Sequence, residues 1–241
     1  MTAPDGAGRR AELAANLAAV QASIAAACAV AGRDPAEVHL IAVTKTFPVP
    51  DIMLLHELGI DDVGENKDQE AAPKVAACSA AGLDLRWHFV GQLQANKAAS
   101  VVSYAYMVHS VDRMRLVEAL GSRAVAAGRQ VRCLVQVSLD GVPGAGRGGA
   151  DPDQVPALAD AIAGHDGLLL AGVMAVAPLG QAARPAYARL RAIAETVRSA
   201  HPGAQVISAG MSGDLGEAIA EGATHVRIGT ALLGGRRAFV R

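Results

Sequence analysis

The stretch HLIAVTKTFPVPD, residues 39–51, joins an apolar run to a lysine and a turn. Leu40 to Val43 are apolar, Lys45 follows two residues later, and Pro48 ends the extended segment. A short apolar run that is bounded by a turn signal predicts a buried strand. A lone lysine at a strand end is more often a surface side chain. The rest of the sequence must therefore decide whether Lys45 has a function.

The composition limits the classes of function. Apolar residues make up 51% of the 241 residues and aromatic residues only 3%, which predicts a large core of small side chains. A formal net charge of -1 and few aromatic rings argue against a nucleic-acid partner. The three cysteines, Cys28, Cys78 and Cys133, form no CxxC pair, so neither a disulfide framework nor a zinc cluster is indicated. This pattern favours a reducing cytoplasm.

The N-terminal segment resembles a secretory signal only in part. Arg9 and Arg10 precede an alanine-rich run, but polar residues interrupt that run. Leu13, Leu17, Val20 and Ile24 recur at helical spacing. We therefore expect an amphipathic helix over residues 9–31 that lies on a core or on a partner, and we expect no membrane-spanning segment. A monomer or a weak dimer is compatible with this pattern.

Eight short apolar runs alternate with alanine-rich helical stretches. The predicted strands are Val38–Val43, Asp62–Gly64, Trp87–Val90, Tyr106–His109, Val131–Val137, Leu168–Met174, Gln205–Ile207 and His225–Ile228. Such alternation predicts parallel strands joined by helices, and about eight units close into a (β/α)8 barrel. An open doubly wound sheet is the alternative. No linker divides the chain, so we expect residues 1–241 to form a single domain.

Polar residues follow several of these strands. In a (β/α)8 barrel the strand ends and following loops form one face, which holds the chemistry. The residues concerned are Lys45, Glu65, Asn66, His88, Gln92, His109, Ser110, Arg227 and Thr230. An amine that apolar walls enclose loses solvation of its charged form, which increases its neutral, nucleophilic fraction. Lys45 in such a place would form a Schiff base with a carbonyl compound.

The carbonyl cofactor with this habit is pyridoxal phosphate, which also needs a site for its phosphate. Residues Ser208 to Ser212 follow strand seven and open a short helix around residues 214–221. Gly229 and Thr230 follow strand eight. Barrels often bind phosphate between the loops after strands seven and eight, with glycines that allow close backbone approach. The alternative is that Ser212 only caps its own helix.

Seven motifs, in order, resemble those of the pyridoxal phosphate homeostasis proteins. They are AVTKTFP, VGENKDQE, WHFVGQLQANK, HSVDR, GVMAVAP, ISAGMSGDL and GATHVRIGTALLG, and they are spread along nearly the whole chain after residue 36. The family is similar to the N-terminal domain of alanine racemase. The resemblance implies a single-domain barrel of the fold type III class that binds pyridoxal 5'-phosphate (PLP).

The resemblance also implies a role for individual residues. Lys45 would hold PLP covalently, Asn66 would lie near its ring, and Arg227 would face the pyridine nitrogen. The phosphate would lie on Ser212, Gly229 and Thr230, with backbone groups of Gly210 and Met211. Ser208, which begins the loop, and His88 are further candidates for lining the site. A permanent cation at the pyridine nitrogen opposes its protonation and weakens the ring as an electron sink.

Some positions depart from the family pattern or imitate another motif. Ala209 stands where methionine is common, and Ser138 and Arg147 replace an asparagine and a lysine of the strand-five loop. Residues 144–149, GAGRGG, satisfy GxGxxG, but Pro143 separates them from the strand and a new helix is expected at Asp151. We expect a basic lid there, while the role of loop 141–150 stays open. The dispersed histidines indicate no metal site.

Two functions remain open at this point. A racemase of the alanine racemase type would need a second base opposite Lys45, whereas Tyr104, Tyr106 and Tyr187 match no such motif. The resemblance instead implies a protein without robust catalysis that takes part in PLP homeostasis. It would hold PLP reversibly and buffer it or deliver it to PLP-dependent apoenzymes.

Overall fold

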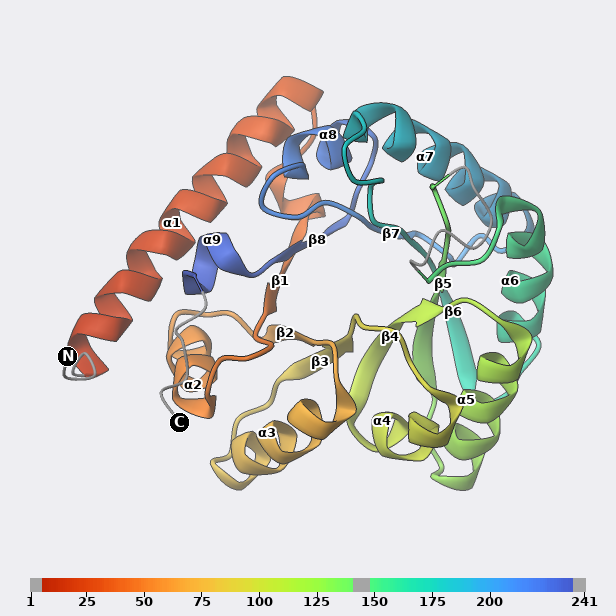
Figure 1. Ribbon diagram of the computed structural model, residues 1–241, viewed down its shortest axis with the longest axis horizontal. Coiled ribbons are helices and arrows are strands. Elements are labelled where there is room, and N and C mark those ends of the chain that lie inside the picture. The colour runs from red at the N-terminus through yellow and green to blue at the C-terminus, as the bar shows by residue number, and fades with distance from the viewer. Residues whose placement is uncertain (1–5, 141–147, 236–241) are drawn as a thin grey trace.

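The computed structural model describes residues 6–140 and 148–235, which form eight parallel strands closed into a barrel in sequence order (Figure 1). The strands are β1 His39–Val43, β2 Asp62–Glu65, β3 Arg86–Phe89, β4 Ala105–Val111, β5 Val131–Gln136, β6 Leu168–Met174, β7 Val206–Ser208 and β8 His225–Ile228. The predicted (β/α)8 barrel is confirmed, and the open sheet is wrong. Each predicted strand overlaps the observed one.

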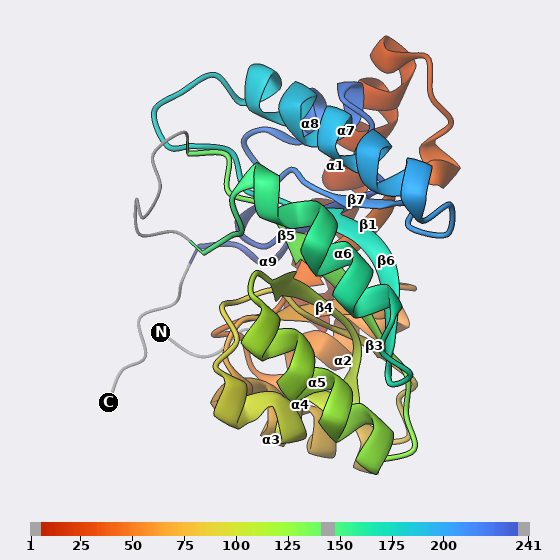
Figure 2. The same cartoon turned by 90° about the vertical axis from the view of Figure 1, so that its right-hand side faces the viewer.

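Helices cover the outside of the barrel. They are α1 Gly6–Ala31, α2 Val49–Glu57, α3 Asp68–Ala80, α4 Ala98–Tyr104, α5 Met114–Ala126, α6 Val155–Ala163, α7 Ala183–Ala200, α8 Leu215–Ala220 and α9 Thr230–Leu233. Short 3-10 helices occur at η1 Pro35–Glu37, η2 Ala95–Lys97 and η3 Pro152–Gln154. Helices α5 and α6 lie outside β5 and β6, for example (Figure 2).

The barrel closes where β1 pairs with β8. Ile41 lies opposite Arg227 and Ala42 lies opposite Ile228 in this parallel pair. β1 also pairs with β2 on its other side, which leaves no free strand edge at the closure. Closure therefore brings the loop after β1 next to the loop after β8.

Helix α1 covers this closure. The helices that follow β7 and β8, α8 and α9, are short, and α1 packs against both of them (Figure 1). Its buried side chains are Arg9, Leu13, Leu17, Val20, Ile24 and Cys28, which share one helical face. The apolar ones belong to the same cluster as Ile219, Val226 and Leu232. The predicted amphipathic helix thus covers the barrel itself.

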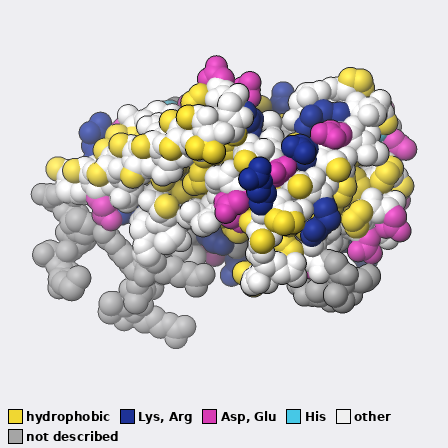
Figure 3. All heavy atoms as spheres, turned by 90° about the horizontal axis from the view of Figure 1, so that it is seen from above, with side chains coloured by type: hydrophobic (Ala, Val, Ile, Leu, Met, Phe, Trp, Pro, Cys, Tyr) yellow, Lys and Arg dark blue, Asp and Glu magenta, His cyan; other side chains and the backbone are white. Residues whose placement is uncertain are grey.

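By length and composition, α1 could also cross a membrane. Its packing on the barrel through one face, and the ion pair of the buried Arg9 with Asp51, are instead typical of an amphipathic helix on the surface of a folded domain. Cys28, Cys78 and Cys133 are buried and free. On the face shown in Figure 3, Lys and Arg side chains are interspersed with Asp and Glu.

Two ion pairs join α1 to α2, and they differ in burial. The Arg9 guanidinium donates to both Asp51 carboxylate oxygens, at 3.1 and 2.8 Å, and also to the carbonyl of Leu233 at 3.0 Å. Asp51 is 7% exposed. The Arg10–Glu57 pair, at 3.3 Å, has both side chains about half exposed. The two pairs therefore allow a comparison, at one interface, of how much a buried and an exposed ion pair contribute to stability.

We predict that Asp51→Asn lowers the free energy of unfolding by about 2 kcal/mol, because it leaves the buried Arg9 charge with less compensation. Glu57→Gln, the matched control, should change it by less than about 0.5 kcal/mol, because exposed pairs contribute little. Urea unfolding at pH 7 measures both values. Equal effects of the two substitutions would contradict the assigned role of burial.

Candidate functional site

Lys45 lies in a turn directly after β1, at the carboxyl ends of the strands. Its side chain is exposed, so the expectation that apolar walls enclose the amine is wrong for the chain by itself. Thr46, which follows, has a φ of 68°, a left-handed conformation that is rare for a β-branched residue. The turn is therefore held in a specific shape although the lysine side chain itself is exposed.

Side chains from β2 and α3 hold this turn on one side. The Thr44 hydroxyl donates to Glu65 Oε1 at 2.7 Å, and Lys74 Nζ donates to the same oxygen at 2.6 Å and to the Thr44 carbonyl at 2.9 Å. The amide of Thr46 donates to Glu70 Oε2 at 3.1 Å. The residues on both sides of Lys45 are thus fixed, which determines where its side chain begins.

Glu65 is the buried centre of this arrangement and is only 1% exposed. Burial raises its pKa, against the hydrogen bond and charge of Lys74. The sequence identifies Glu65 as a polar strand end without a role, and it does not reveal the roles of Thr44 and Lys74. The signal was present in Glu65, because a carboxylate that ends a buried strand requires a partner.

The loop after β7 forms a tight backbone corner at Gly210. Its φ is 92°, and a Cβ placed there would lie 2.8 Å from the Ala218 Cβ and 3.2 Å from the Leu215 Cα. Only glycine therefore fits this position without a shift of α8. The amide of Arg227 in β8 donates to the Gly210 carbonyl at 3.0 Å, which ties this loop to the neighbouring strand.

Beyond the corner, Ser212 and Thr230 are exposed and follow adjacent strands. Among the described residues, the amides of Ser212 and Gly213 donate to no acceptor. The amide of Met211 is different, because it donates to Asp214 Oδ1 at 2.6 Å. Asp214 Oδ2 in turn accepts from the Tyr187 hydroxyl at 2.8 Å. In the β7 loop, the free donors of the expected phosphate site are therefore the amides of Ser212 and Gly213, while that of Met211 is already engaged.

Gly229 and Asn66 lie on either side of β1. A Cβ on Gly229 would lie 3.5 Å from the Val43 Cβ, so the start of α9 lies against the end of β1. Asn66 is half-buried, and its carbonyl would lie 2.1 Å from a Cβ on Gly91. The structure thus gathers the ends of β8, β1 and β2, with Thr230, Lys45 and Asn66, along one arc of the barrel mouth.

Three other predicted residues lie inside the barrel and not at its mouth. Arg227 is 5% exposed, Ser208 0% and His88 1%. Arg227 donates to the Ser208 hydroxyl oxygen at 2.7 Å and to the Ala175 carbonyl at 3.0 Å. His88 contacts His109 and Asp62, the first residue of β2, so it lies towards the opposite end of the barrel. Ser208 and His88 therefore lie below Arg227 in the barrel interior.

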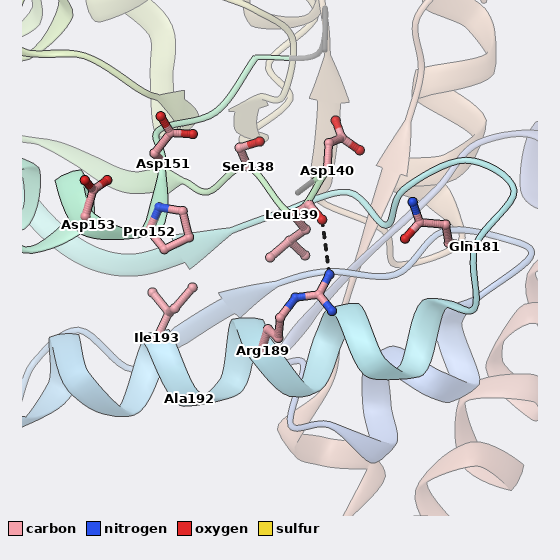
Figure 4. A pocket seen from close by; sticks show the side chains of 10 residues that line it. All are labelled: Ser138, Leu139, Asp140, Asp151, Pro152, Asp153, Gln181, Arg189, Ala192 and Ile193. Atoms are coloured by element: carbon pink, nitrogen blue, oxygen red, sulfur yellow. Dashed lines mark hydrogen bonds between the residues drawn. The ribbon is translucent and has the colours of Figure 1, made fainter. Parts of the chain in front are cut away.

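Two hollows lie at the mouth near strands that are not adjacent to β1. One of about 260 Å³ lies at the carboxyl ends of β3, β5 and β6, between Gln92, Gln136 and Met174. Another, of about 920 Å³, lies beside the β5 loop (Figure 4). There Arg189 of α7 donates to the Leu139 carbonyl at 3.1 Å.

The lining of the larger hollow contains none of the residues predicted to hold the cofactor. The expected lid at residues 144–149, with Arg147, lies mostly outside the described residues. Within residues 6–140 and 148–235, no three His, Cys, Asp or Glu side chains lie together as metal ligands would.

Residues 15–237 match the family model described as "Alanine racemase, N-terminal domain". A pyridoxal phosphate homeostasis protein of Mycobacterium bovis is 42% identical over 95% of each chain. The chain belongs to the pyridoxal phosphate homeostasis protein family. Among solved structures, a Bifidobacterium adolescentis protein of unknown function superposes with a TM-score of 0.87 at 31% identity, over 96% of this chain and 97% of the other.

A family member with its cofactor is among these relatives. PipY of Synechococcus elongatus, solved with PLP bound, is 33% identical and has a TM-score of 0.80, over 92% of this chain and all of the other. Alanine racemase of Corynebacterium glutamicum is 14% identical with a TM-score of 0.68, and the match covers 95% of this chain but 62% of the racemase. The likeness to alanine racemase thus extends to the fold alone.

Burial lowers the pKa of three histidines, of which His88 and His109 are fully buried and His225 is half-buried. Burial lowers the pKa of His88 and lowers that of His109 well below its ordinary value. The pKa of His225 falls to about 3, first through burial and then through the charge of His39. A histidine with a lowered folded pKa binds fewer protons when folded, so its contribution to stability is complete above about pH 6.5 and is lost as the pH falls.

We predict that the free energy of unfolding decreases from pH 7 to pH 5, by up to about 1.4 kcal/mol per pH unit for each of these histidines. Glu65, whose pKa is raised by burial, contributes a slope of the opposite sign. His225→Gln should remove the contribution of one histidine to this pH dependence. Urea unfolding at pH 7, 6 and 5 compares the two proteins, and equal slopes would contradict the prediction.

Proposed function

We propose that this protein binds PLP reversibly, as a Schiff base on Lys45, and serves intracellular PLP homeostasis by buffering the cofactor or delivering it to apoenzymes. The observation that carries the proposal is the structure of PipY with PLP bound, because that relative matches the chain over nearly its full length. When bound, PLP would supply an aldehyde that an amine can capture.

The residues at the mouth fit this cofactor. Lys45 presents a primary amine on a turn that Thr44, Glu65 and Lys74 fix by hydrogen bonds. A Cβ at Gly210 would fill the corner of the β7 loop, and the amides of Ser212 and Gly213 have room for acceptors. Oxygen acceptors of a phosphate match this donor set, with the hydroxyls of Ser212 and Thr230 beside it.

Arg227 and Asn66 would complete the site by contacting the ring. A guanidinium stays protonated near the pyridine nitrogen, so that nitrogen remains unprotonated and the ring withdraws electrons weakly. Asn66 offers an amide beside the same arc of the mouth. These residues support binding of the cofactor more than they support carbanion chemistry.

The tyrosines of the chain favour a carrier over a racemase. The hydroxyl of Tyr104 donates to Asp68, and that of Tyr187 donates to Asp214. Burial raises the pKa of each, and the neighbouring carboxylate raises it further, which disfavours a base. Tyr106 lies at the amino ends of the strands against Arg132, on the opposite side from Lys45. We therefore propose that the protein has no robust catalytic activity.

Several wider features belong to the same proposal. We propose that the chain works as one domain, because α1 buries its apolar face on the barrel closure. Exposure of Lys45, Ser212 and Thr230 suits transfer of the cofactor to apoenzymes. Buried free cysteines agree with a cytoplasmic location, and a monomer or weak dimer would leave the mouth open.

We predict that the purified protein incubated with PLP is yellow and that borohydride fixes one PLP to Lys45. Mass spectrometry of proteolytic fragments gives both the added mass and the modified residue. Lys45→Ala should lose the colour, whereas Lys67→Ala, a nearby exposed lysine, should keep it. Attachment at another residue, or an unchanged spectrum in Lys45→Ala, would refute the proposed role of Lys45.

We predict that Ser212→Ala and Thr230→Ala each speed the loss of PLP about tenfold, because each removes a hydrogen bond to a charged phosphate worth about 1.5 kcal/mol. The absorption spectrum of the bound cofactor should change little, since the attachment at Lys45 is intact. Dialysis followed by absorbance measures the rate. Retention equal to that of the unmodified protein would place the phosphate elsewhere.

A further inference from the structure

A chain of four hydrogen bonds runs through the barrel from Arg227 to Asp62. Arg227 NH1 lies 2.7 Å from Ser208 Oγ, which lies 2.9 Å from His109 Nδ1. His109 Nε2 lies 2.9 Å from His88 Nδ1, and His88 Nε2 lies 2.9 Å from Asp62 Oδ1. The five side chains come from β8, β7, β4, β3 and β2. The chain therefore connects strands on several sides of the barrel.

The donors in this chain can point in one consistent direction. A guanidinium only donates, and an ionised carboxylate only accepts. A neutral histidine has one donor and one acceptor nitrogen, so His88 must donate from Nε2 to Asp62 and accept at Nδ1. His109 must then donate from Nε2 to His88 and accept at Nδ1 from the Ser208 hydroxyl. All four bonds thus run from Arg227 towards Asp62.

The charge states that this direction requires are those the interior favours. Burial opposes the charge on Asp62, but hydrogen bonds from Arg86 and His88 outweigh it and hold its pKa well below the usual range. Burial lowers the pKa of both His88 and His109, which keeps them neutral. Ser208, His109 and His88 are each at most 1% exposed. Solvent has little access with which to disrupt the order.

Asp62 is the end that fixes the direction. Arg86 Nε donates to Asp62 Oδ1 and Arg86 NH2 to Oδ2, each at 2.7 Å. Both residues line a hollow of about 610 Å³ at the amino ends of the strands, together with Arg132 and His225. At the other end, the Ser208 oxygen could accept from His109 as well as from Arg227. Without Asp62, therefore, nothing in the chain would forbid the reverse order.

We propose that Asp62, His88 and His109 are positioning residues for Ser208 and Arg227, and that they act on the PLP site from the opposite end of the barrel. The inference rests on the proposed function for its effect on the cofactor. Arg227 has only neutral acceptors among the described residues, Ser208 Oγ and the Ala175 carbonyl. The order imposed by Asp62 leaves the lone pairs of Ser208 directed at Arg227. The guanidinium is thereby held in one orientation, in which it would face the pyridine nitrogen of bound PLP.

The first test uses the cofactor-free protein. Nitrogen-15 NMR distinguishes the two tautomers of each histidine, and we expect His88 and His109 both to carry the proton on Nε2. In Asp62→Ala, His109 should become a mixture of tautomers although it does not contact residue 62. A pure Nδ1–H form in the unmodified protein, or an unchanged His109 signal in a folded Asp62→Ala protein, would overturn the proposal.

Two further variants keep the test decisive. Asp62→Asn preserves the shape of the side chain and serves as the test if Asp62→Ala does not fold. Because its amide group can either donate or accept, it should also yield mixed tautomers of His109. Arg132→Gln is the matched control, because Arg132 lines the same hollow and stacks on Tyr106 outside the chain. It should leave both histidine tautomers unchanged. An equal response to Arg132→Gln would show a general effect of charge and overturn the proposal.

The second test adds PLP and measures its rate of loss and its absorption maximum. Asp62→Asn should shift the absorption maximum and lose PLP about fivefold faster, as expected when one buried hydrogen bond is weakened. Arg132→Gln should match the unmodified protein. An unmodified protein that holds no PLP would refute the proposed function. The NMR measurement would still test the direction of the hydrogen bonds between Arg227 and Asp62. A PLP-loaded Asp62→Asn protein with unchanged loss and spectrum would overturn this inference alone.

Discussion

The pairing of β1 with β8 is the constraint on which the site depends. Lys45 and Thr230 are far apart in sequence, and they become neighbours only because Ile41 and Ala42 lie opposite Arg227 and Ile228. The short α8 and α9 leave this closure thinly covered on the outside. Helix α1 covers it with four buried aliphatic side chains, each worth roughly 1.5–3 kcal/mol when fully buried, and with Cys28. The N-terminal helix thus stabilises the geometry of a mouth that it does not enter.

The mouth combines a fixed backbone with exposed side chains. Thr44 and Thr46 are bonded to β2 and α3 on both sides of Lys45, whereas the lysine itself is exposed. The β7 loop has the same character, because Gly210 is packed tightly against α8 and Ser212 is open. Binding to such a site needs little reorganisation, and release needs no lid to open among the described residues. Both properties suit reversible binding.

Sequence patterns predicted those residues of the site that come after the ends of strands, because such residues gather on one face of a barrel. Lys45, Asn66, Ser212 and Thr230 come within four residues of the ends of their strands, so parallel pairing places them on one face. The rule does not apply to His88, which lies within a strand. The depth of such a residue in the barrel depends on how far each strand is offset from its neighbours along the barrel axis. Register shifts at Trp87/His88 and between Val108 and Val111 determine that His88 meets His109. No periodicity in the sequence reports such shifts.

The expectation that apolar walls enclose Lys45 is wrong for a related reason. Strand residues are buried by their neighbours in the sheet, but a residue in the following turn is covered only by other loops. Lys74 could not be found from spacing either, since α3 must first pack beside β2 before its amine reaches Glu65. Contacts between a helix and the next loop depend on tertiary packing, which local patterns do not encode.

The interior of the barrel contains a permanent positive charge because residue 227 is an arginine. A buried lysine can lose its proton, but a guanidinium keeps its charge and must be satisfied where it lies. Met107, Leu134, Ala171 and Met174 form an apolar cluster on one side. Each polar side chain that shares the interior with this cluster must therefore find a partner to offset its burial. A connected row of hydrogen bonds that reaches the barrel's far end meets that requirement, and it links the buried charge of Arg227 to the carboxylate of Asp62.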